Sequence, residues 1–322
     1  MHTIHAHDIH VALASGIDWL EVAGVQETSR NGAVLASPVP VCTAYARPEC
    51  RVLRSATRDA NPFFHVVESA WMLAGRNDLA LLKQYVSTFG AYSDDGVTIP
   101  DAYGYRWRRH FGFDQLPMLI SELRQHPDSR RCVLQMWDAR VDLERMLAGG
   151  KAVPCNTQAY FAIRKGKLEM TVCNRSNDAI LGAYGANAVH FGFLQEYVAA
   201  HLRVGVGTYY QISNNLHIYS DVHPKEKRER MAPELFARRE EPSLLMEWDT
   251  DGLDWDLGVF EHTDYLPSPR SRWFAALVCP VQRVWNARKA GASVEEQLSR
   301  CTEIGPADWR AACTEWIERR VK

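Results

Sequence analysis

The chain has 322 residues, of which 46% are hydrophobic and 24% are charged, and this ordinary globular composition is ample for a sizeable core. Its 37 Lys and Arg against 39 Asp and Glu leave a formal net charge of -2, which argues against a protein that holds nucleic acid by bulk positive charge. No run approaches the roughly 18 apolar residues that a membrane span needs, and the first residues lack the basic and apolar regions of a signal peptide. We therefore expect a soluble, cytoplasmic protein.

The eight cysteines form no C-x-x-C pair, so neither a zinc site nor a disulfide framework is expected. In a reducing compartment such residues are mostly small core side chains, among which one reactive thiol can occur. The chain also lacks G-x-G-x-x-G and G-x-x-x-x-G-K-[ST], which disfavours a doubly wound nucleotide-binding fold.

Hydrophobic periodicity and turn residues predict a mixed α+β fold in which strands do not alternate regularly with helices. The first clear element is a helix over 63–75, apolar on nearly all sides, in which Glu68 is costly to bury unless it is paired or functional. Lys165-Gly166 is a hairpin signal between two later strands. The later elements are strands over 131–137, 158–163, 168–173 and 208–218, a buried helix over 186–202, and amphipathic helices over 293–301 and 306–320.

Cys155 directly follows Pro154 at the start of the predicted hairpin, and Arg175 stands at the far end of the partner strand. A hairpin would bring the two side chains to neighbouring strands, where a cation lowers the pKa of a thiol and favours the nucleophilic thiolate. Taken alone, a single cysteine is more often a core residue, and an arginine is as often part of a surface ion pair. The pattern therefore indicates a nucleophile only in combination with other motifs.

Two further groups have both a functional and a structural interpretation. Arg130 and Arg131 could present two guanidinium groups to one phosphate, although paired arginines usually only solvate a surface. His217 and Tyr219 share one face of a strand, where half-buried hydrogen-bonding side chains are common. A papain-like hydrolase is disfavoured because the residues around Cys155 do not match the cysteine-protease signature and the arginines would have no role in it.

Together these groups resemble the folate-dependent thymidylate synthase family, over residues from about 30 to about 219. Six motifs occur in the family's order and near its spacing, and this combination is far more specific than any one of them. They are Glu68 in ESAWMLAG, Tyr103-Gly104 with Trp107-Arg108, Asp128-Ser129-Arg130-Arg131, Pro154-Cys155, Arg175-Ser176 with Asp178, and His217-Ile218-Tyr219.

The resemblance implies a thymidylate-synthase-like mixed sheet packed by helices, with extra C-terminal helices. It implies one domain over 1–322, with a catalytic core over about 15–285 and a helical extension over about 290–322. It also implies that Cys155 adds to C6 of a pyrimidine nucleotide monophosphate, so that C5 attacks the methylene of 5,10-methylenetetrahydrofolate. Neither a metal nor a flavin is implied.

The same resemblance assigns the remaining roles residue by residue. Arg30, Arg175 and Ser176 would bind the 5′-phosphate, and Arg130 and Arg131 would reach it from the partner subunit of a homodimer.

His217 and Tyr219 would bind the sugar, and Asn187 would bind the base. Glu68 would organise water and protons as a catalytic group. Asp178 would act in catalysis and line the folate side together with Phe89 and Tyr103.

Four departures from the family pattern favour its hydroxymethylase branch. Asn156 replaces the histidine that follows the nucleophile, and Phe89 stands where a tryptophan shields the folate-derived methylene. Asn187, in L-G-A-Y-G-A-N-A, falls one residue late, and the chain ends in ERRVK without the apolar segment that closes over folate. A wetter site lets water add to the exocyclic methylene, giving a hydroxymethyl group instead of a methyl group.

We therefore expect a cytidylate 5-hydroxymethylase acting on CMP or dCMP. The preference for cytosine rests mainly on the resemblance, because the amide of Asn187 could turn over to serve either base. A further alternative is that Asn187 is a helix-start residue that never touches the base. A thymidylate synthase, a dUMP hydroxymethylase and a non-catalytic nucleotide-binding paralogue stay open as alternatives, and the sequence does not choose between ribose and deoxyribose.

Overall fold

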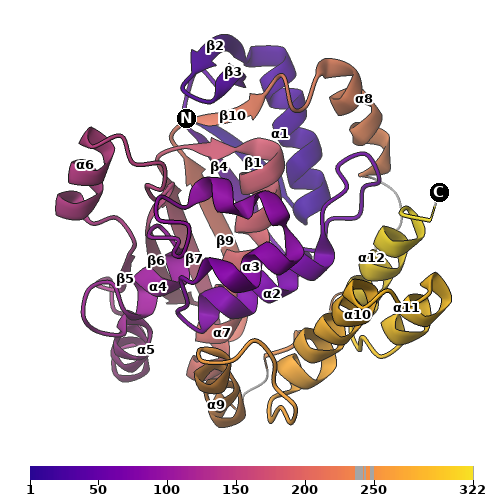
Figure 1. Ribbon diagram of the computed structural model, residues 1–322. Coiled ribbons are helices and arrows are strands. Elements are labelled where there is room, and N and C mark those ends of the chain that lie inside the picture. Colours follow the sequence, from indigo (N-terminus) through magenta and orange to yellow (C-terminus); the bar gives the residue numbers. More distant parts are fainter. Residues whose placement is uncertain (236–241, 243, 247–249, 322) are drawn as a thin grey trace.

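A mixed six-stranded sheet forms the centre of the computed structural model, which describes residues 1–235, 242, 244–246 and 250–321 (Figure 1). Within these residues its strand order is β1-β4-β9-β7-β6-β5, and a smaller four-stranded sheet has the order β2-β3-β10-β8. The strands are β1 (His2–Ala6), β2 (Val25–Ser29), β3 (Gly32–Ala36), β4 (Val41–Tyr45), β5 (Val133–Gln135), β6 (Asn156–Arg164), β7 (Lys167–Asn174), β8 (Asn177–Asp178), β9 (Gly205–Ser213) and β10 (Leu216–Tyr219). The predicted α+β class is confirmed.

Helices cover the large sheet and extend beyond it at the C-terminal end of the chain (Figure 1). The α-helices are α1 (Ile9–Ala23), α2 (Pro62–Leu73), α3 (Leu79–Tyr85), α4 (Tyr103–Arg108), α5 (Gln115–Gln125), α6 (Ala139–Leu147), α7 (Asn187–Leu202), α8 (Lys225–Glu234), α9 (Thr250–Phe260), α10 (Cys279–Lys289), α11 (Val294–Cys301) and α12 (Ala307–Glu318). A 3-10 turn, η1 (Ser87–Tyr92), and two wide π-type turns, η2 (Ala179–Ala186) and η3 (Phe274–Val278), complete the described elements. No described helix is both long and apolar enough to cross a membrane.

The predicted hairpin forms between β6 and β7. Lys165 and Gly166 connect the strands, and both have positive φ angles, 51° and 72°, which suit a two-residue turn. Residues directly across the strands run from Arg164 opposite Lys167 to Asn156 opposite Asn174. This register brings the start of β6 and the end of β7 to the same end of the hairpin.

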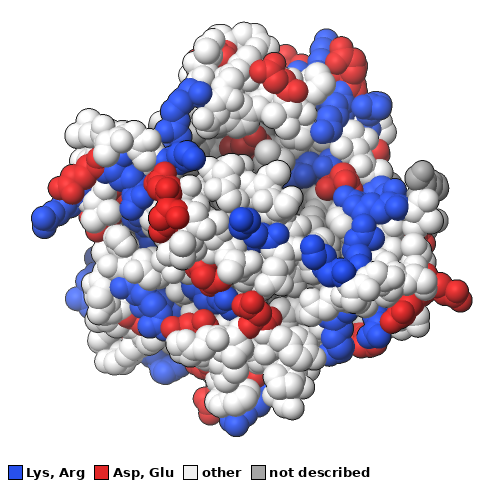
Figure 2. Space-filling model, in the orientation of Figure 1, with Lys and Arg blue, Asp and Glu red and all other residues white. Residues whose placement is uncertain are grey.

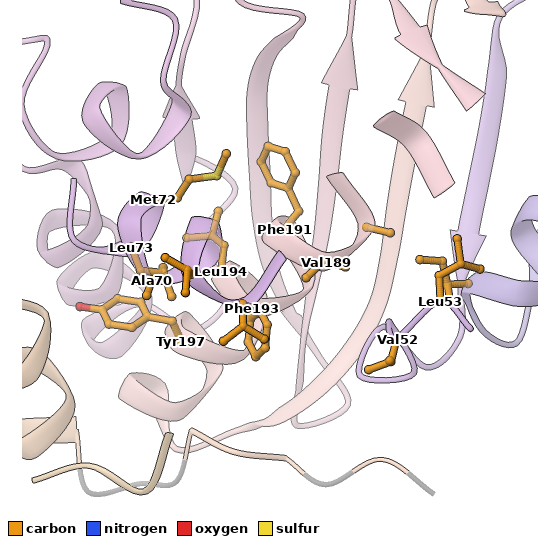
Figure 3. Packing of buried hydrophobic residues seen from close by; sticks show 14 of the residues in the cluster. Val52, Leu53, Ala70, Met72, Leu73, Val189, Phe191, Phe193, Leu194 and Tyr197 are labelled. Carbon is orange, nitrogen blue, oxygen red and sulfur yellow. The ribbon is translucent and has the colours of Figure 1, made fainter. Parts of the chain in front are cut away.

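The core is centred on the two buried helices α2 and α7, which pack against each other (Figure 3). Asn61 caps α2 by accepting a hydrogen bond from the backbone of Phe64, and Pro62 occupies the first turn, where no N–H is needed. Gly104 lets α4 approach α2, because a Cβ atom there would lie 1.8 Å from the carbonyl oxygen of Met72. The small residue of the Y-G motif therefore has a packing role.

The strand predicted over 208–218 is wrong as a single element. The chain divides there into β9 of the large sheet and β10 of the small one, with Asn214 and Asn215 between them. The N–H of Asn214 donates to the carbonyl of Asn174, and the carbonyl of Asn215 accepts from Asn177. These bonds hold the turn that carries the chain from one sheet to the other. The strand predicted over 131–137 is shorter than expected and covers only β5.

The two predicted C-terminal helices are confirmed as α11 and α12. The face predicted for α12 is buried, since Trp309, Cys313, Trp316 and Ile317 are each at most 5% exposed. Trp316 packs edge-on against Phe63 of α2, with ring centroids 5.4 Å apart. Helix α12 therefore packs against the helix that carries Glu68. Lys322, the last residue of the predicted extension, lies outside the described residues.

Candidate active site

Cys155 and Arg175 lie side by side at the open end of the β6–β7 hairpin. The backbone N–H of Arg175 donates to the carbonyl of Cys155 at 2.9 Å, and its guanidinium donates to the carbonyls of Pro154 and Val153, each at 2.8 Å. One guanidinium nitrogen, Nη2, lies 3.7 Å from the sulfur of Cys155. The strand pairing thus brings together the thiol and the cation as the hairpin pattern predicted.

The net effect on the thiol is the opposite of the one expected from the sequence. Burial raises the pKa of Cys155 above its ordinary value, and this outweighs the lowering by Arg175 and Arg30. The carboxylate of Asp101 raises the pKa of the thiol further. The expectation that Arg175 lowers the pKa of the thiol took account of the nearby cation but not of the desolvation of the sulfur.

Two polar side chains from the start of α4 flank the nucleophile. Burial raises the pKa of Asp101 to about 6. Burial, followed by the neighbouring Cys155, raises the pKa of the Tyr103 hydroxyl, and the nearby Asn156 partly offsets this. Tyr103, predicted on the folate side, thus lies beside the thiol. The sequence analysis missed Asp101, although its place two residues before the Y-G motif was a usable signal.

Glu68 and His190 connect the two core helices at this site. Glu68 is 5% exposed, and its Oε2 lies 3.0 Å from Nε2 of His190. His190 follows Asn187 by three residues on α7, so the two share a face of the helix. Burial, followed by the influence of His190, lowers the pKa of the neighbouring His65 well below its usual range. The carboxylate that the sequence singled out therefore has a buried histidine as its neighbour.

Phe89 lies on the same side of α2 as Glu68. Its ring contacts Phe64, which precedes Glu68 by four residues, with centroids 5.4 Å apart. Tyr92 also packs against Phe89, edge-on and at the same centroid distance. Phe89 thus forms part of an aromatic wall and has the support of neighbouring rings.

Asp178 and His217 are neighbours across the short pairing of β8 and β10. The Oδ1 atom of Asp178 caps η2 by accepting from the backbone of Ile180 and Leu181, while burial raises the pKa of the carboxyl. Burial lowers the pKa of His217, and the charge of Asp178 partly offsets this. The ring of Tyr219 stands perpendicular to that of His217, with centroids 5.0 Å apart. The two side chains predicted to share a strand face do so.

Arg30 and Arg175 approach the thiol from different sheets. Arg30 lies in the turn between β2 and β3, and its charge lowers the pKa of Cys155. Ser176 is half-buried and directly follows Arg175. Figure 2 shows the surface hollowed below the β2–β3 hairpin, with acidic side chains at the bottom of the hollow. Two cations and a hydroxyl near one thiol suit an anionic substrate.

Arg130 and Arg131 stay apart from this group within one chain. Both are exposed and precede the edge strand β5, and Arg131 pairs with Glu122 at 2.7 Å. The backbone of Phe161 donates to Cys132, so Arg131 lies beyond that point, roughly 20 Å from Cys155 at about 3.3 Å per strand residue. A role at the same site would therefore need a second chain.

Three buried asparagines form a hydrogen-bonded row beside Cys155. Asn156 donates through Nδ2 to Oδ1 of Asn187 at 3.3 Å, and Asn187 donates through Nδ2 to Oδ1 of Asn177 at 3.0 Å. Gly182 leaves room for this row, because a Cβ atom there would lie 2.9 Å from Oδ1 of Asn177. Asn187 was predicted to be a base contact, whereas the contribution of Asn177 was missed. The signal was a second amide within the R-S-x-D motif.

No group of three or more His, Cys, Asp or Glu that could hold a metal ion occurs in the part of the chain that the structure describes. The chemistry available at the site is that of a thiol nucleophile beside buried acids, cations and amides.

Comparison with known proteins gives two kinds of match. The family model described as thymidylate synthase matches residues 24–276. A "Deoxyuridylate hydroxymethyltransferase" of Pseudomonas phage M6 is 43% identical over 99% of this chain and 95% of its own length. One of the same name from Bacillus phage SP01 is 38% identical over 56% of this chain and 50% of its own length. A "Putative thymidylate synthase" of Methanothermobacter marburgensis is 37% identical over 46% of this chain and 62% of its own length.

Proposed function

Because the chain belongs to the thymidylate synthase family, we propose that it is an enzyme that converts deoxyuridylate to its 5-hydroxymethyl derivative. The family has the α+β thymidylate synthase fold, binds a pyrimidine nucleotide and folate, and uses methylenetetrahydrofolate as the one-carbon donor. The relatives named as deoxyuridylate hydroxymethyltransferases favour this substrate over the cytidylate expected from the sequence. The proposal rests on one observation: Cys155 is paired with Arg175 in a chain that is 43% identical to a relative named as a deoxyuridylate hydroxymethyltransferase.

The reaction begins with the addition of the Cys155 sulfur to C6 of uracil, which makes C5 a nucleophile. C5 forms a bond to the methylene carbon of the folate, loses its proton and expels tetrahydrofolate, which leaves an exocyclic methylene on the ring. Water adds to this methylene as a hydroxyl group, and C6 releases the thiolate. No carbon is reduced after folate departs, so tetrahydrofolate is regenerated without forming dihydrofolate.

The side chains around Cys155 divide the remaining tasks. The cations Arg30 and Arg175, with Ser176, bind the 5′-phosphate, and Arg130 and Arg131 join them from the partner subunit of a homodimer. This assignment accounts for two exposed arginines that have no place at the site within one chain.

The sugar, the base and the folate occupy the rest of the site. His217 and Tyr219 bind the sugar hydroxyl, and Asn187 binds the base. Glu68, beside His190, positions water and moves protons near C5. Asp178 is half-buried, and its carboxyl, whose pKa is raised by desolvation, suits the folate side and proton transfer.

Two features favour the addition of water over the transfer of hydride in the last step. Phe89 presents a smaller ring than the tryptophan of the family pattern, and it rests on an aromatic wall with no indole to shield the methylene. Asn156 replaces a histidine next to the nucleophile. A less shielded methylene is open to addition of water.

The test is an incubation of the full chain with methylenetetrahydrofolate and, separately, dUMP, dCMP, UMP and CMP, with the products identified by mass. A gain of CH2O on dUMP supports the proposal. A gain of CH2 with dihydrofolate formation identifies a thymidylate synthase, and a gain of CH2O on a cytidylate returns the assignment to cytosine. Cys155→Ala should abolish turnover and leave nucleotide binding nearly intact, and full activity of that variant would refute the mechanism.

A further inference from the structure

We propose that a chain of four buried amides, anchored on the backbone carbonyl of Ala183, fixes the direction of the Asn187 amide and so makes the site select uracil over cytosine. This inference rests on the proposed function, in which Asn187 faces the base. It assigns a specificity role to Gln211, Asn177 and Asn156, side chains that act through Asn187.

The anchor is an atom that can only accept hydrogen bonds. The carbonyl oxygen of Ala183 accepts from Nε2 of Gln211 at 3.4 Å and from the hydroxyl of Tyr45 at 3.1 Å. If the Gln211 amide turned over, its oxygen would face this carbonyl oxygen, and two buried acceptors would oppose each other. The Nε2 of Gln211 therefore stays on the side of Ala183, where it also donates to the hydroxyl of Tyr209 at 2.9 Å.

The direction passes from one amide to the next. Oε1 of Gln211 accepts from Nδ2 of Asn177 at 3.2 Å, and the same nitrogen donates to the hydroxyl of Ser213 at 3.0 Å. The Oδ1 of Asn177 must then face Asn187, and it accepts from Nδ2 of Asn187 at 3.0 Å. The Oδ1 of Asn187 in turn accepts from Nδ2 of Asn156 at 3.3 Å. Every amide in the chain has the same donor-to-acceptor sense.

Because the four amides are buried, reversing their donor-to-acceptor direction costs free energy. Asn156, Asn177, Asn187 and Gln211 are each at most 8% exposed, so water cannot replace a broken contact. Turning Asn187 alone would set its oxygen against the oxygen of Asn177 and its nitrogen against the nitrogen of Asn156, which breaks two buried hydrogen bonds. Turning all four together would still leave Gln211 opposed to Ala183. Among the members of the chain, only this carbonyl cannot exchange donor and acceptor roles.

The consequence is a choice between bases. Asn187 keeps one N–H and one oxygen lone pair beyond those used in the chain. Uracil presents a donor at N3 and an acceptor at O4, whereas cytosine presents an acceptor at N3 and a donor at N4. A nucleotide held by its phosphate and by Cys155 cannot turn its base over, so one fixed amide matches only one of the two patterns. The proposed substrate makes that pattern the one of uracil.

The experiment measures dissociation constants of dUMP and dCMP for the folded full chain by tryptophan fluorescence. Selectivity for dUMP over dCMP should be about 10- to 100-fold, the range of one bidentate amide contact. Gln211→Met keeps the length of the side chain but removes the anchored amide, and it should reduce the selectivity to about threefold or less. Circular dichroism and thermal melting establish that each variant is folded.

Two variants distinguish the effect of the direction of the Asn187 amide from a general loss of stability of the fold. Gln195→Met removes a glutamine that is equally buried and donates to the backbone carbonyls of Leu168 and Gly207, outside the amide chain, so the dUMP selectivity should not change. Asn177→Asp breaks the chain on the side of Gln211 but keeps an acceptor facing Asn187, so the selectivity should be retained.

Equal binding of the two nucleotides by the unmodified chain, or unchanged selectivity in folded Gln211→Met, would overturn the inference. Loss of selectivity in Asn177→Asp or an equal loss in Gln195→Met would do the same. Failure of the proposed function alone gives a different result: the binding selectivity depends on Gln211, but the incubation yields no hydroxymethylated product. Binding of neither nucleotide would overturn both proposals.

Discussion

Replacing Arg175 with glutamine should raise the pKa of Cys155. The Nη2 atom of Arg175 lies 3.7 Å from the sulfur, where Coulomb's law gives about 1 kcal/mol in bulk water and about 4 kcal/mol at an effective dielectric constant of about 20. Because Arg175 is exposed, the effect lies near the lower value, which corresponds to about one pKa unit at about 1.4 kcal/mol per unit. The thiol should become a poorer nucleophile at neutral pH.

The assay is the rate of alkylation of Cys155 by iodoacetamide as a function of pH. The peptide that carries Cys155 is quantified by mass spectrometry, which separates it from the other free cysteines. Arg175→Gln should move the profile to higher pH, and Arg175→Lys should move it less because the positive charge stays nearby.

Arg164→Gln is the matched control, since this arginine is exposed, pairs with Glu169 and lies at the turn end of the hairpin, opposite the end that carries Cys155. Its profile should coincide with that of the unmodified chain. The electrostatic argument is refuted if Arg175→Gln alkylates with an unchanged pH profile, or if Arg164→Gln shifts it as much.

Four further outcomes are expected. Asp101→Asn removes a charge that raises the pKa of Cys155, so the alkylation profile should move to lower pH; a shift to higher pH would contradict this. In the folded protein the pKa of Asp101 is about 6, so its carboxyl binds a proton more tightly than in the unfolded chain. The stability that this proton binding contributes is therefore present at low pH and is lost as the pH rises through about 4 to 6. Urea titrations of Asp101→Asn should lack this loss of unfolding free energy. Asp142→Ala leaves the fully buried Arg106 without its two carboxylate contacts and should cost about 3–5 kcal/mol of unfolding free energy, whereas a cost below about 1 kcal/mol would mean that water reaches the guanidinium. Trp316→Ala should cost a similar amount, about 3–5 kcal/mol, because it empties an aromatic cluster, and an unchanged urea midpoint would show that α12 does not stabilise the fold.

The parts of the fold that the sequence predicted are those with local signals. The β6–β7 hairpin follows from Lys165-Gly166, and the buried helices α2 and α7 follow from apolar runs that a turn or a capping residue ends. The division of the predicted 208–218 strand was not predictable in this way. The alternation of apolar and other residues continues on both sides of the turn at Asn214 and Asn215. Only the hydrogen bonds of this turn to Asn174 and Asn177 reveal the change of sheet.

At the candidate site, too, features with a local sequence signal were predicted and features set by distant residues were not. The motifs brought together Cys155 with Arg175 and His217 with Tyr219, because each pair lies on neighbouring strands or on one strand. The state of the thiol and the direction of the Asn187 amide were expected incorrectly or left open. The first depends on burial by the whole fold, and the second on a backbone carbonyl reached through Asn177 and then Gln211. Such properties are set by partners that no local pattern contains.

The ion pair between Arg54 and Glu315 joins residues 261 positions apart in the chain, and Nε of Arg54 lies 3.2 Å from the carboxylate. During synthesis a ribosome must therefore release α12 before the first part of the chain can complete its packing. Until then α2 exposes the apolar face that later contacts Trp316, a surface to which chaperones or other nascent chains can bind. Contacts of such long range also slow folding, because the closure of a large loop precedes any gain from it. Slowing translation over the last two helices should therefore lower the yield of native protein more than slowing it over the hairpin that carries Cys155.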